Sequence, residues 1–299
     1  MNPLVRFAVR RLDQKCQNLE AGIEADHRIP DDVLEDLDMP FQGAEGVPLA
    51  ADIFRPRDRG FRPLPVVVMI HGGGLVVGTR KLSRTFCEKL AARGYLVFAP
   101  DYRRATETDA YHEIGDVAAA FSYVSGKLAE YGGDPDRVIV VSESAGTFVS
   151  LYAIAAMGSP VLRKVFGLSV SSVLRVRMLA CFSGFFYTAR KDPVGMVYAP
   201  NLYGKRRKDK TYKRYMNPEC PEVMEHLPPI FLVGSDADFL KSYTKRYAKA
   251  LRRAGHPCEL VYYKDNRKLT HAFPALKPDL PESGKVIDQM LDWSKGLGI

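Results

Sequence analysis

Apolar residues in this chain fall mostly into short uninterrupted runs that alternate with amphipathic stretches. Runs without a period of two are typical of strands covered on both faces, and such strands form parallel sheets with right-handed crossovers. The pattern predicts an α/β fold with a mostly parallel central sheet flanked by helices. The expected strands are residues 31–42, 48–55, 65–70, 95–99, 138–141, 177–186, 230–233 and 259–263, and the expected helices are residues 3–24, 82–93, 114–131, 146–157, 240–253 and 282–297.

Residues 187–227 break this alternation, because they are rich in proline, tyrosine and charge. We expect this segment to be an insertion that forms a helical cap over the active edge of the sheet. The amphipathic helix of residues 3–24 could touch a membrane surface, but packing on the body as part of the cap is the favoured interpretation. The predicted organisation is residues 1–47 as the N-terminal cap contribution and first strand, residues 48–186 and 228–299 as the core, and residues 187–227 as the cap insertion.

The composition restricts the class of protein. A length of 299 residues leaves room for a cap, because one α/β core commonly takes about 200–250 residues. The five cysteines are scattered without CxxC spacing, which argues against a disulfide framework or a zinc site and favours a reducing cytoplasm. No apolar run approaches the roughly 18 residues of a membrane span, and the first residues lack a secretory signal pattern. The sequence does not set an oligomeric state, and a homodimer is compatible with it.

Much of the net charge of +8 lies in one stretch, residues 205–214, which holds seven lysines and arginines. Nucleic-acid binding is one interpretation of such a cluster, and attraction of anionic substrates is another. The cluster is short and lies on no recognisable nucleic-acid module. We therefore expect a solvated cap surface and no nucleic-acid partner.

A nucleophilic serine is expected where the strand at 138–141 is followed by a helix. The sequence there, Ser142-Glu143-Ser144-Ala145-Gly146, is similar to the G-x-S-x-G turn that exposes a nucleophilic serine. Ser142 replaces the first glycine with another small residue. Ser144 could instead be only a helix N-cap. In the catalytic interpretation, the N–H of Ala145 is one donor to an oxyanion.

A glycine-rich loop, His71-Gly72-Gly73-Gly74, follows the strand at 65–70. Glycines let backbone N–H groups approach a substrate without interference from a Cβ atom. We predict that Gly73 and Gly74 supply the other oxyanion donors. A phosphate-binding loop would need a Lys-Ser/Thr pair at the start of the next helix, and Gly78-Thr79-Arg80-Lys81 does not supply that spacing. His71 is expected to orient the loop.

A catalytic base is expected late in the chain, and His271 lies between the last strand and the last helix. The acid that orients it should follow the strand at 230–233, where both Asp236 and Asp238 stand. Spacing alone does not separate these two residues, and the unused one would be a helix cap. The remaining loop and helix-edge histidines are expected at the surface: His27, His112, His226 and His256.

These motifs, in this order, resemble the hormone-sensitive-lipase-like family of carboxylesterases. The family has an HGGG loop, a D-Y-R segment matched by Asp101-Tyr102-Arg103, a G-D-S-A-G-like elbow, and an acid loop after a Pro-Pro strand matched by Pro228-Pro229. His271-Ala272-Phe273 is similar to its H-G-F motif. The resemblance covers roughly residues 48–295. It implies an α/β-hydrolase fold with a cap, and it favours Asp238 over Asp236.

We therefore predict a serine hydrolase that cleaves small to medium carboxylic esters through an acyl-enzyme. Ser144 would be the nucleophile, His271 the base and Asp238 the orienting acid, with no metal or organic cofactor. Amide and thioester hydrolysis use the same machinery and stay open. A non-catalytic ligand-binding protein on this scaffold is the less favoured alternative, because all three triad positions carry suitable residues.

Overall fold

The computed structural model describes residues 3–25, 27–58, 60, 62–169, 174–192, 195–196, 202–203 and 208–299. Its centre is an eight-stranded sheet with the order β1-β2-β4-β3-β5-β6-β7-β8. Strand β2 pairs antiparallel with β1 and β4, and the remaining pairs are parallel. This confirms the predicted α/β fold with a mostly parallel sheet. The strands are β1 (Val33–Gln42), β2 (Pro48–Pro56), β3 (Leu64–Ile70), β4 (Leu96–Pro100), β5 (Gly133–Glu143), β6 (Val176–Phe182), β7 (Ile230–Ser235) and β8 (Cys258–Tyr263).

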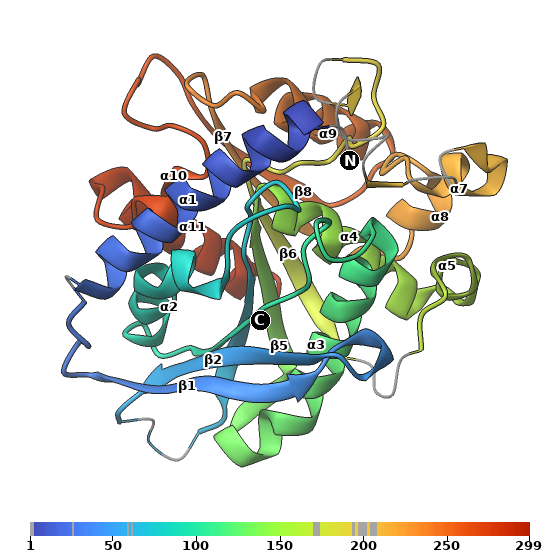
Figure 1. Cartoon of the computed structure of the whole chain (residues 1–299). Helices are drawn as coiled ribbons and strands as arrows, with labels where there is room; N and C mark the ends of the chain where they lie inside the picture. Colours follow the sequence, from blue (N-terminus) through green and yellow to red (C-terminus); the bar gives the residue numbers. More distant parts are fainter. Residues whose placement is uncertain are drawn as a thin grey trace.

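Helices cover both faces of the sheet (Figure 1). Helices α3, α4 and α9 contribute to one apolar core, and α2 and α11 contribute to the other. The bounds of the α-helices are α1 (Pro3–Ala25), α2 (Arg84–Ala91), α3 (Ala110–Tyr131), α4 (Ala145–Gly158), α5 (Pro160–Phe166), α7 (Lys210–Tyr215), α8 (Pro221–Met224), α9 (Lys241–Arg253), α10 (Phe273–Leu276) and α11 (Pro281–Gly296). Two short 3-10 helices are η1 (Ala44–Gly46) and η2 (Arg80–Ser83).

The uninterrupted apolar runs of the central strands are explained by these two cores. In β3, Val66 and Val68 face the core of α3 and α4, whereas Val67 and Met69 face the core of α2 and α11. Alternate side chains of a strand point to opposite faces of a sheet. A strand buried on both faces therefore needs apolar residues at every position, which is the pattern that the sequence carries.

Two of the differences from the predicted elements concern β5 and α5; β6 also ends at Phe182 and not at residue 186, and α10 was not predicted. Strand β5 begins at Gly133, before the predicted residue 138, and Gly133 pairs with Leu64 of β3. Helix α5, which was not predicted, is N-capped by the Ser159 side chain and ends at Gly167 in a left-handed conformation. The first difference arises because the polar start of β5, Gly133-Asp134-Pro135-Asp136, has a turn-like composition.

The described part of residues 187–227 packs against α9. The hydroxyl of Tyr187 donates to Glu219 (2.8 Å), which also binds Arg246 of α9 (2.7 Å). The hydroxyl of Tyr243, also on α9, donates to Asp192 (2.8 Å). Of the basic stretch, residues 205–207 lie outside the described residues, and the described Lys208, Lys210, Lys213 and Arg214 are exposed.

Helix α1 rests on η2 and its flanking residues through polar contacts. The carboxylate of Glu20 accepts hydrogen bonds from the backbone N–H and the hydroxyl of Thr79 (3.0 and 2.9 Å). Glu24 pairs with Lys81 (2.6 Å). Within the described residues, no helix has both the length and the apolar character needed to cross a membrane.

Candidate active site

The predicted site residues come together because their loops leave the same edge of the sheet. Strands β3 and β5 are parallel neighbours, with Ile70 opposite Ser142. The glycine loop that follows β3 and the serine turn that follows β5 therefore adjoin each other. Asp238 follows β7, and His271 follows β8. Ligands of open α/β sheets typically bind outside the carboxyl ends of the strands.

Ser144, His271 and Asp238 form one continuous hydrogen-bonded series. His271 Nε2 lies 2.8 Å from Ser144 Oγ, and His271 Nδ1 lies 2.7 Å from Asp238 Oδ1. An ionised carboxylate can only accept hydrogen bonds, so Nδ1 must carry the proton. Nε2 is then left as an acceptor for the Ser144 hydroxyl. Asp238 Oδ1 also accepts the N–H of Leu240 (2.9 Å), which fixes the carboxylate.

Ser144 has an unusual backbone conformation, with φ 48° and ψ −116°. A non-glycine residue held there stores about 1–3 kcal/mol of strain, and such strain clusters at functional sites. The backbone of the turn packs tightly against the end of β3. A Cβ on Gly146 would stand 2.3 Å from the Ile70 carbonyl oxygen. This contact requires glycine at position 146. Position 142 has no such requirement, because the Ser142 hydroxyl donates to the Ala180 carbonyl (3.0 Å) within the core.

The glycine loop has the conformation that its sequence predicts. Gly73 has φ 104° and Gly74 has φ 63°, in the region that glycine reaches without steric cost. A Cβ on Gly73 would lie 1.8 Å from the Val77 carbonyl oxygen. The loop lies against the serine, because a Cβ on Gly72 would stand 3.1 Å from Ser144 Cβ. Ala145 is the first residue of α4, where N–H groups have no partner within the helix.

His71 lies inside the loop and does not reach the serine. Its ring stacks on Tyr102 with the centroids 4.4 Å apart, and Nδ1 lies 2.9 Å from the Gly72 carbonyl oxygen. The Tyr102 hydroxyl donates to the His71 carbonyl oxygen (2.9 Å). Burial lowers the pKa of His71, so the neutral ring holds the loop in place.

The carboxylate of Asp236 has partners other than His271. It accepts a hydrogen bond from the Tyr262 hydroxyl (2.8 Å) and pairs with Lys245 (3.3 Å). The Tyr262 hydrogen bond and the Lys245 charge lower the pKa of Asp236. Of the two aspartates that spacing left open, only Asp238 contacts the imidazole among the described hydrogen bonds.

Three further residues at the site received no role from the sequence. Glu143 Oε1 accepts the N–H of Gly72 (3.0 Å) from a fully buried position. Ser183 Oγ accepts the N–H of Ala272 (2.9 Å), beside His271. The Phe239 ring lies over the His271 ring, with the centroids 4.2 Å apart, and is 70% exposed. The position of Glu143 next to the nucleophile was a visible signal, whereas the other two contacts join separate loops and have no motif.

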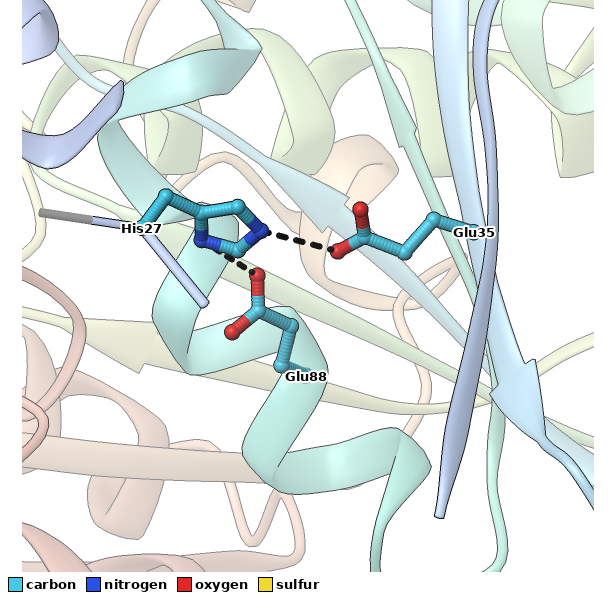
Figure 2. A group of neighbouring side chains, drawn as sticks. All are labelled: His27, Glu35 and Glu88. Atoms are coloured by element: carbon cyan, nitrogen blue, oxygen red, sulfur yellow. Dashed lines mark ion pairs between the residues drawn. The ribbon is translucent and has the colours of Figure 1, made fainter. Parts of the chain in front are cut away.

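The histidines expected at the surface are all partly buried, and His27 departs clearly from the prediction. Its side chain is only 11% exposed, because it lies between acidic residues of β1 and α2 (Figure 2). His112 and His226 retain 33% and 29% of their side-chain exposure. A loop position therefore did not imply a surface position for His27.

Comparisons with known proteins agree with this geometry. A sequence profile described as the alpha/beta hydrolase fold matches residues 67–275. The carboxylic ester hydrolase LipN of Mycobacterium tuberculosis is 27% identical over 250 residues, which cover 80% of this chain and 63% of LipN. A probable isoprenylcysteine alpha-carbonyl methylesterase, ICME of Oryza sativa subsp. japonica, is 26% identical over 226 residues, 71% of this chain. The chain spans 53% of the length of that relative.

Solved structures extend the likeness over the whole fold. Esterase B from Lactobacillus rhamnosis, inhibited by a tributyrin phosphonate, has a TM-score of 0.87 at 23% identity and covers 99% of this chain and 96% of its own. A bacterial heroin esterase has a TM-score of 0.75 at 23% identity, over 97% and 92% of the two chains. Because the family profile spans most of the chain and its motifs stand in the expected order, the chain belongs to the alpha/beta hydrolase fold family, as its hormone-sensitive-lipase-like motifs predicted.

Proposed function

We propose that this protein is a serine carboxylesterase that cleaves small to medium carboxylic esters through an acyl-enzyme. One observation carries the proposal: Ser144, His271 and Asp238 are joined by contacts of 2.8 and 2.7 Å at the sheet edge where the glycine loop lies. The names of LipN, a carboxylic ester hydrolase, and of esterase B support the same reaction class.

In the first half of the reaction, Ser144 Oγ attacks the ester carbonyl carbon while His271 Nε2 takes the hydroxyl proton. Asp238 holds the imidazole through Nδ1 and stabilises the imidazolium, and it does not take the proton. The carbonyl oxygen becomes an oxyanion, which the N–H groups of Gly73, Gly74 and Ala145 are proposed to bind. His271 then protonates the leaving alcohol, and an acyl group stays on Ser144.

In the second half, His271 removes a proton from water, and the resulting attack on the acyl carbon forms a second oxyanion in the same position. Collapse of this intermediate returns the proton to Ser144 Oγ and releases the carboxylic acid. The strained turn at Ser144 presents the hydroxyl in one orientation for both steps. No cofactor takes part in either step of the proposal.

The experiment that tests the proposal combines active-site labelling with turnover. We expect Ser144→Ala to abolish labelling by a fluorophosphonate and turnover of nitrophenyl esters from acetate to decanoate. Ser142→Ala is the matched control, because this neighbouring serine lies in the core and should keep both signals. Labelling of Ser144→Ala at the wild-type rate would contradict the proposal. Amide and thioester analogues in the same panel separate ester hydrolysis from the related reactions.

We further infer that residues 187–227 and α1 form a cap that shapes the acyl pocket. The packing of Tyr187, Asp192 and Glu219 against α9, which follows the Asp238 loop, supports this inference. We propose a cytoplasmic protein that acts on small-molecule esters without a nucleic-acid partner. The described cysteines are all free thiols, which fits a reducing compartment.

A further inference from the structure

The loop that carries Asp238 turns one large aromatic side chain toward solvent. Asp238 and Leu240 are buried, with 1% and 3% of their surface exposed, whereas Phe239 between them is 70% exposed. Hydrogen bonds hold the loop on both sides of this ring. The N–H of Asp238 donates to the Ser235 carbonyl (3.3 Å), and the N–H of Leu240 donates to Asp238 Oδ1 (2.9 Å). The outward direction of Phe239 is therefore set by a fixed backbone.

Phe239 lies over the imidazole of the triad. The centroids of the Phe239 and His271 rings are 4.2 Å apart, and their planes are inclined by 34°. Both nitrogens of the imidazole are already engaged, Nδ1 with Asp238 at 2.7 Å and Nε2 with Ser144 at 2.8 Å. Phe239 thus shields part of one face of this ring and turns much of its own surface to solvent.

A single exposed apolar side chain is common on protein surfaces and indicates nothing by itself. Phe239 differs because the reaction brings substrate to the imidazole that it covers. In the proposed esterase function, on which this inference rests, His271 Nε2 protonates the leaving alcohol. The alcohol oxygen must then come within about 2.6–3.2 Å of Nε2. The carbon atoms attached to that oxygen lie next to the imidazole, within reach of the Phe239 ring.

The chemistry of the Phe239 ring selects the kind of alcohol. The ring offers no hydrogen bond, so a polar alcohol gains nothing from it. An apolar alcohol removes both its own surface and that of Phe239 from water, which favours binding in proportion to the area buried. An aromatic alcohol gains further, because two rings attract each other in offset or edge-to-face arrangements.

We propose that Phe239 is a specificity-determining residue that forms an apolar wall for the alcohol part of the ester. The preferred substrates are esters of aromatic or extended alkyl alcohols. The contact exists in the bound substrate and in the transition state alike, and interactions of this kind act mainly on KM. The hydrogen bonds of Ser144, His271 and Asp238 do not involve the Phe239 ring, so its removal leaves the chemical step in place.

The test compares methyl acetate with benzyl acetate, which share the acyl group and differ in the alcohol. Release of acetic acid gives kcat and KM for each ester. We expect Phe239→Ala to lower kcat/KM for benzyl acetate about tenfold, mainly through KM, and to change that for methyl acetate less than about threefold. Phe239→Leu keeps an apolar side chain and should fall between. Val161→Ala is the matched control, because Val161 is another exposed apolar residue (45%), on α5.

The ratio of the two kcat/KM values decides the outcome. An unchanged ratio in Phe239→Ala, with folding verified by circular dichroism, would overturn the inference. Equal losses on both esters would also overturn it, because Phe239 would then only orient the imidazole. A wild type that hydrolyses neither acetate would overturn the esterase proposal together with this inference. An active wild type with an unchanged ratio in the variant overturns this inference alone.

A second measurement does not need turnover. Benzyl alcohol should slow the labelling of Ser144 by a fluorophosphonate, because it occupies the space beside Phe239. Half-maximal protection should require about tenfold more benzyl alcohol in Phe239→Ala than in wild type. The Val161→Ala control should be protected as wild type is. Equal protection of wild type and Phe239→Ala would contradict the apolar wall.

Discussion

At the scale of single residues, the position of one carboxylate decides whether His271 can act as a base. Asp238 is 1% exposed, and its Oδ1 lies 2.7 Å from His271 Nδ1. Asp236 is engaged by Tyr262 and Lys245 instead. An asparagine at position 238 could donate its amide N–H to Nδ1 and would stabilise the tautomer that carries its proton on Nε2. That tautomer cannot accept the proton of Ser144.

We therefore expect Asp238→Asn to lower kcat for a nitrophenyl ester by about 10⁴-fold, the size of effect that follows loss of the orienting acid in a serine triad. Asp236→Asn is the control and should change kcat little, because its partners lie away from the imidazole. Steady-state kinetics of the two variants, with circular dichroism to verify folding, checks this expectation. The reverse ranking would assign the orienting role to Asp236.

Residue-level prediction from sequence is most specific where chain order limits the choice. Ser144 and His271 each follow a strand of a parallel sheet, and the carboxyl ends of such strands meet at one edge. Asp236 and Asp238 occupy the same loop, so spacing left both open and only the family resemblance favoured one. The contact between His27 and Glu88 joins two segments without a motif. It depends on how the chain after α1 packs against α2, and the pattern of residues along the sequence does not predict that packing.

At the scale of elements, Glu143 connects two loops that must keep a fixed relation. It ends β5, next to the serine turn, and its Oε1 accepts the N–H of Gly72 from the loop after β3. The carboxyl is fully buried, and burial raises its pKa. The loop that is proposed to bind the oxyanion is thus hydrogen-bonded to the residue that precedes the nucleophile.

Glu143→Ala should therefore lower kcat with a smaller effect on KM, because the Gly72 N–H loses its acceptor and the loop loses its position. The decrease should stay below the roughly 10²–10³-fold that loss of an oxyanion donor causes. Glu143→Gln keeps an acceptor oxygen and should retain most activity. Parallel measurements of kcat and KM for both variants test this. Equal losses in the two variants would show that the negative charge matters and not the hydrogen bond.

The elements that the sequence placed least well are those whose ends depend on neighbours. The amino-acid composition at the start of β5 is typical of a turn. Gly133 nevertheless pairs with Leu64, because β3 lies alongside it. Helix α5 is short, and its helical period is too brief to detect, although Ser159, Pro160 and Gly167 are its cap signals. The central strands were predictable because burial on both faces gives an apolar run that needs no knowledge of the partner.

At the scale of the whole molecule, the fold could be predicted because two cores share one sheet. Every central strand packs against both cores. Each of these strands therefore has its own uninterrupted apolar run, and the runs together predict the architecture. The packing of the described part of residues 187–227 on α9 leaves no such repeated pattern in the sequence. It depends on single pairs such as Glu219 with Arg246. The cap organisation accordingly stays a proposal, while the α/β core is confirmed.

Complete burial of one carboxyl on α3 makes the stability of the molecule depend on pH through Glu113. This residue of α3 is 0% exposed. Burial, followed by the charges of Asp109 and Asp116, raises its pKa well above the ordinary value of 4.5. The folded state therefore binds the proton more tightly than the unfolded chain. The contribution of Glu113 to the free energy of unfolding is fully present below the unfolded pKa and is lost as pH rises through the folded pKa.

Glu113→Gln removes this proton linkage while keeping the shape of the side chain. We expect the free energy of unfolding of wild type to fall more steeply than that of the variant as the pH rises from about 5 to about 9. Urea denaturation at a series of pH values measures both slopes. Glu130→Gln, at an exposed position of the same helix, should follow the wild-type slope. Coincident slopes for wild type and Glu113→Gln would mean that the core accepts the ionised carboxylate, which its complete burial opposes.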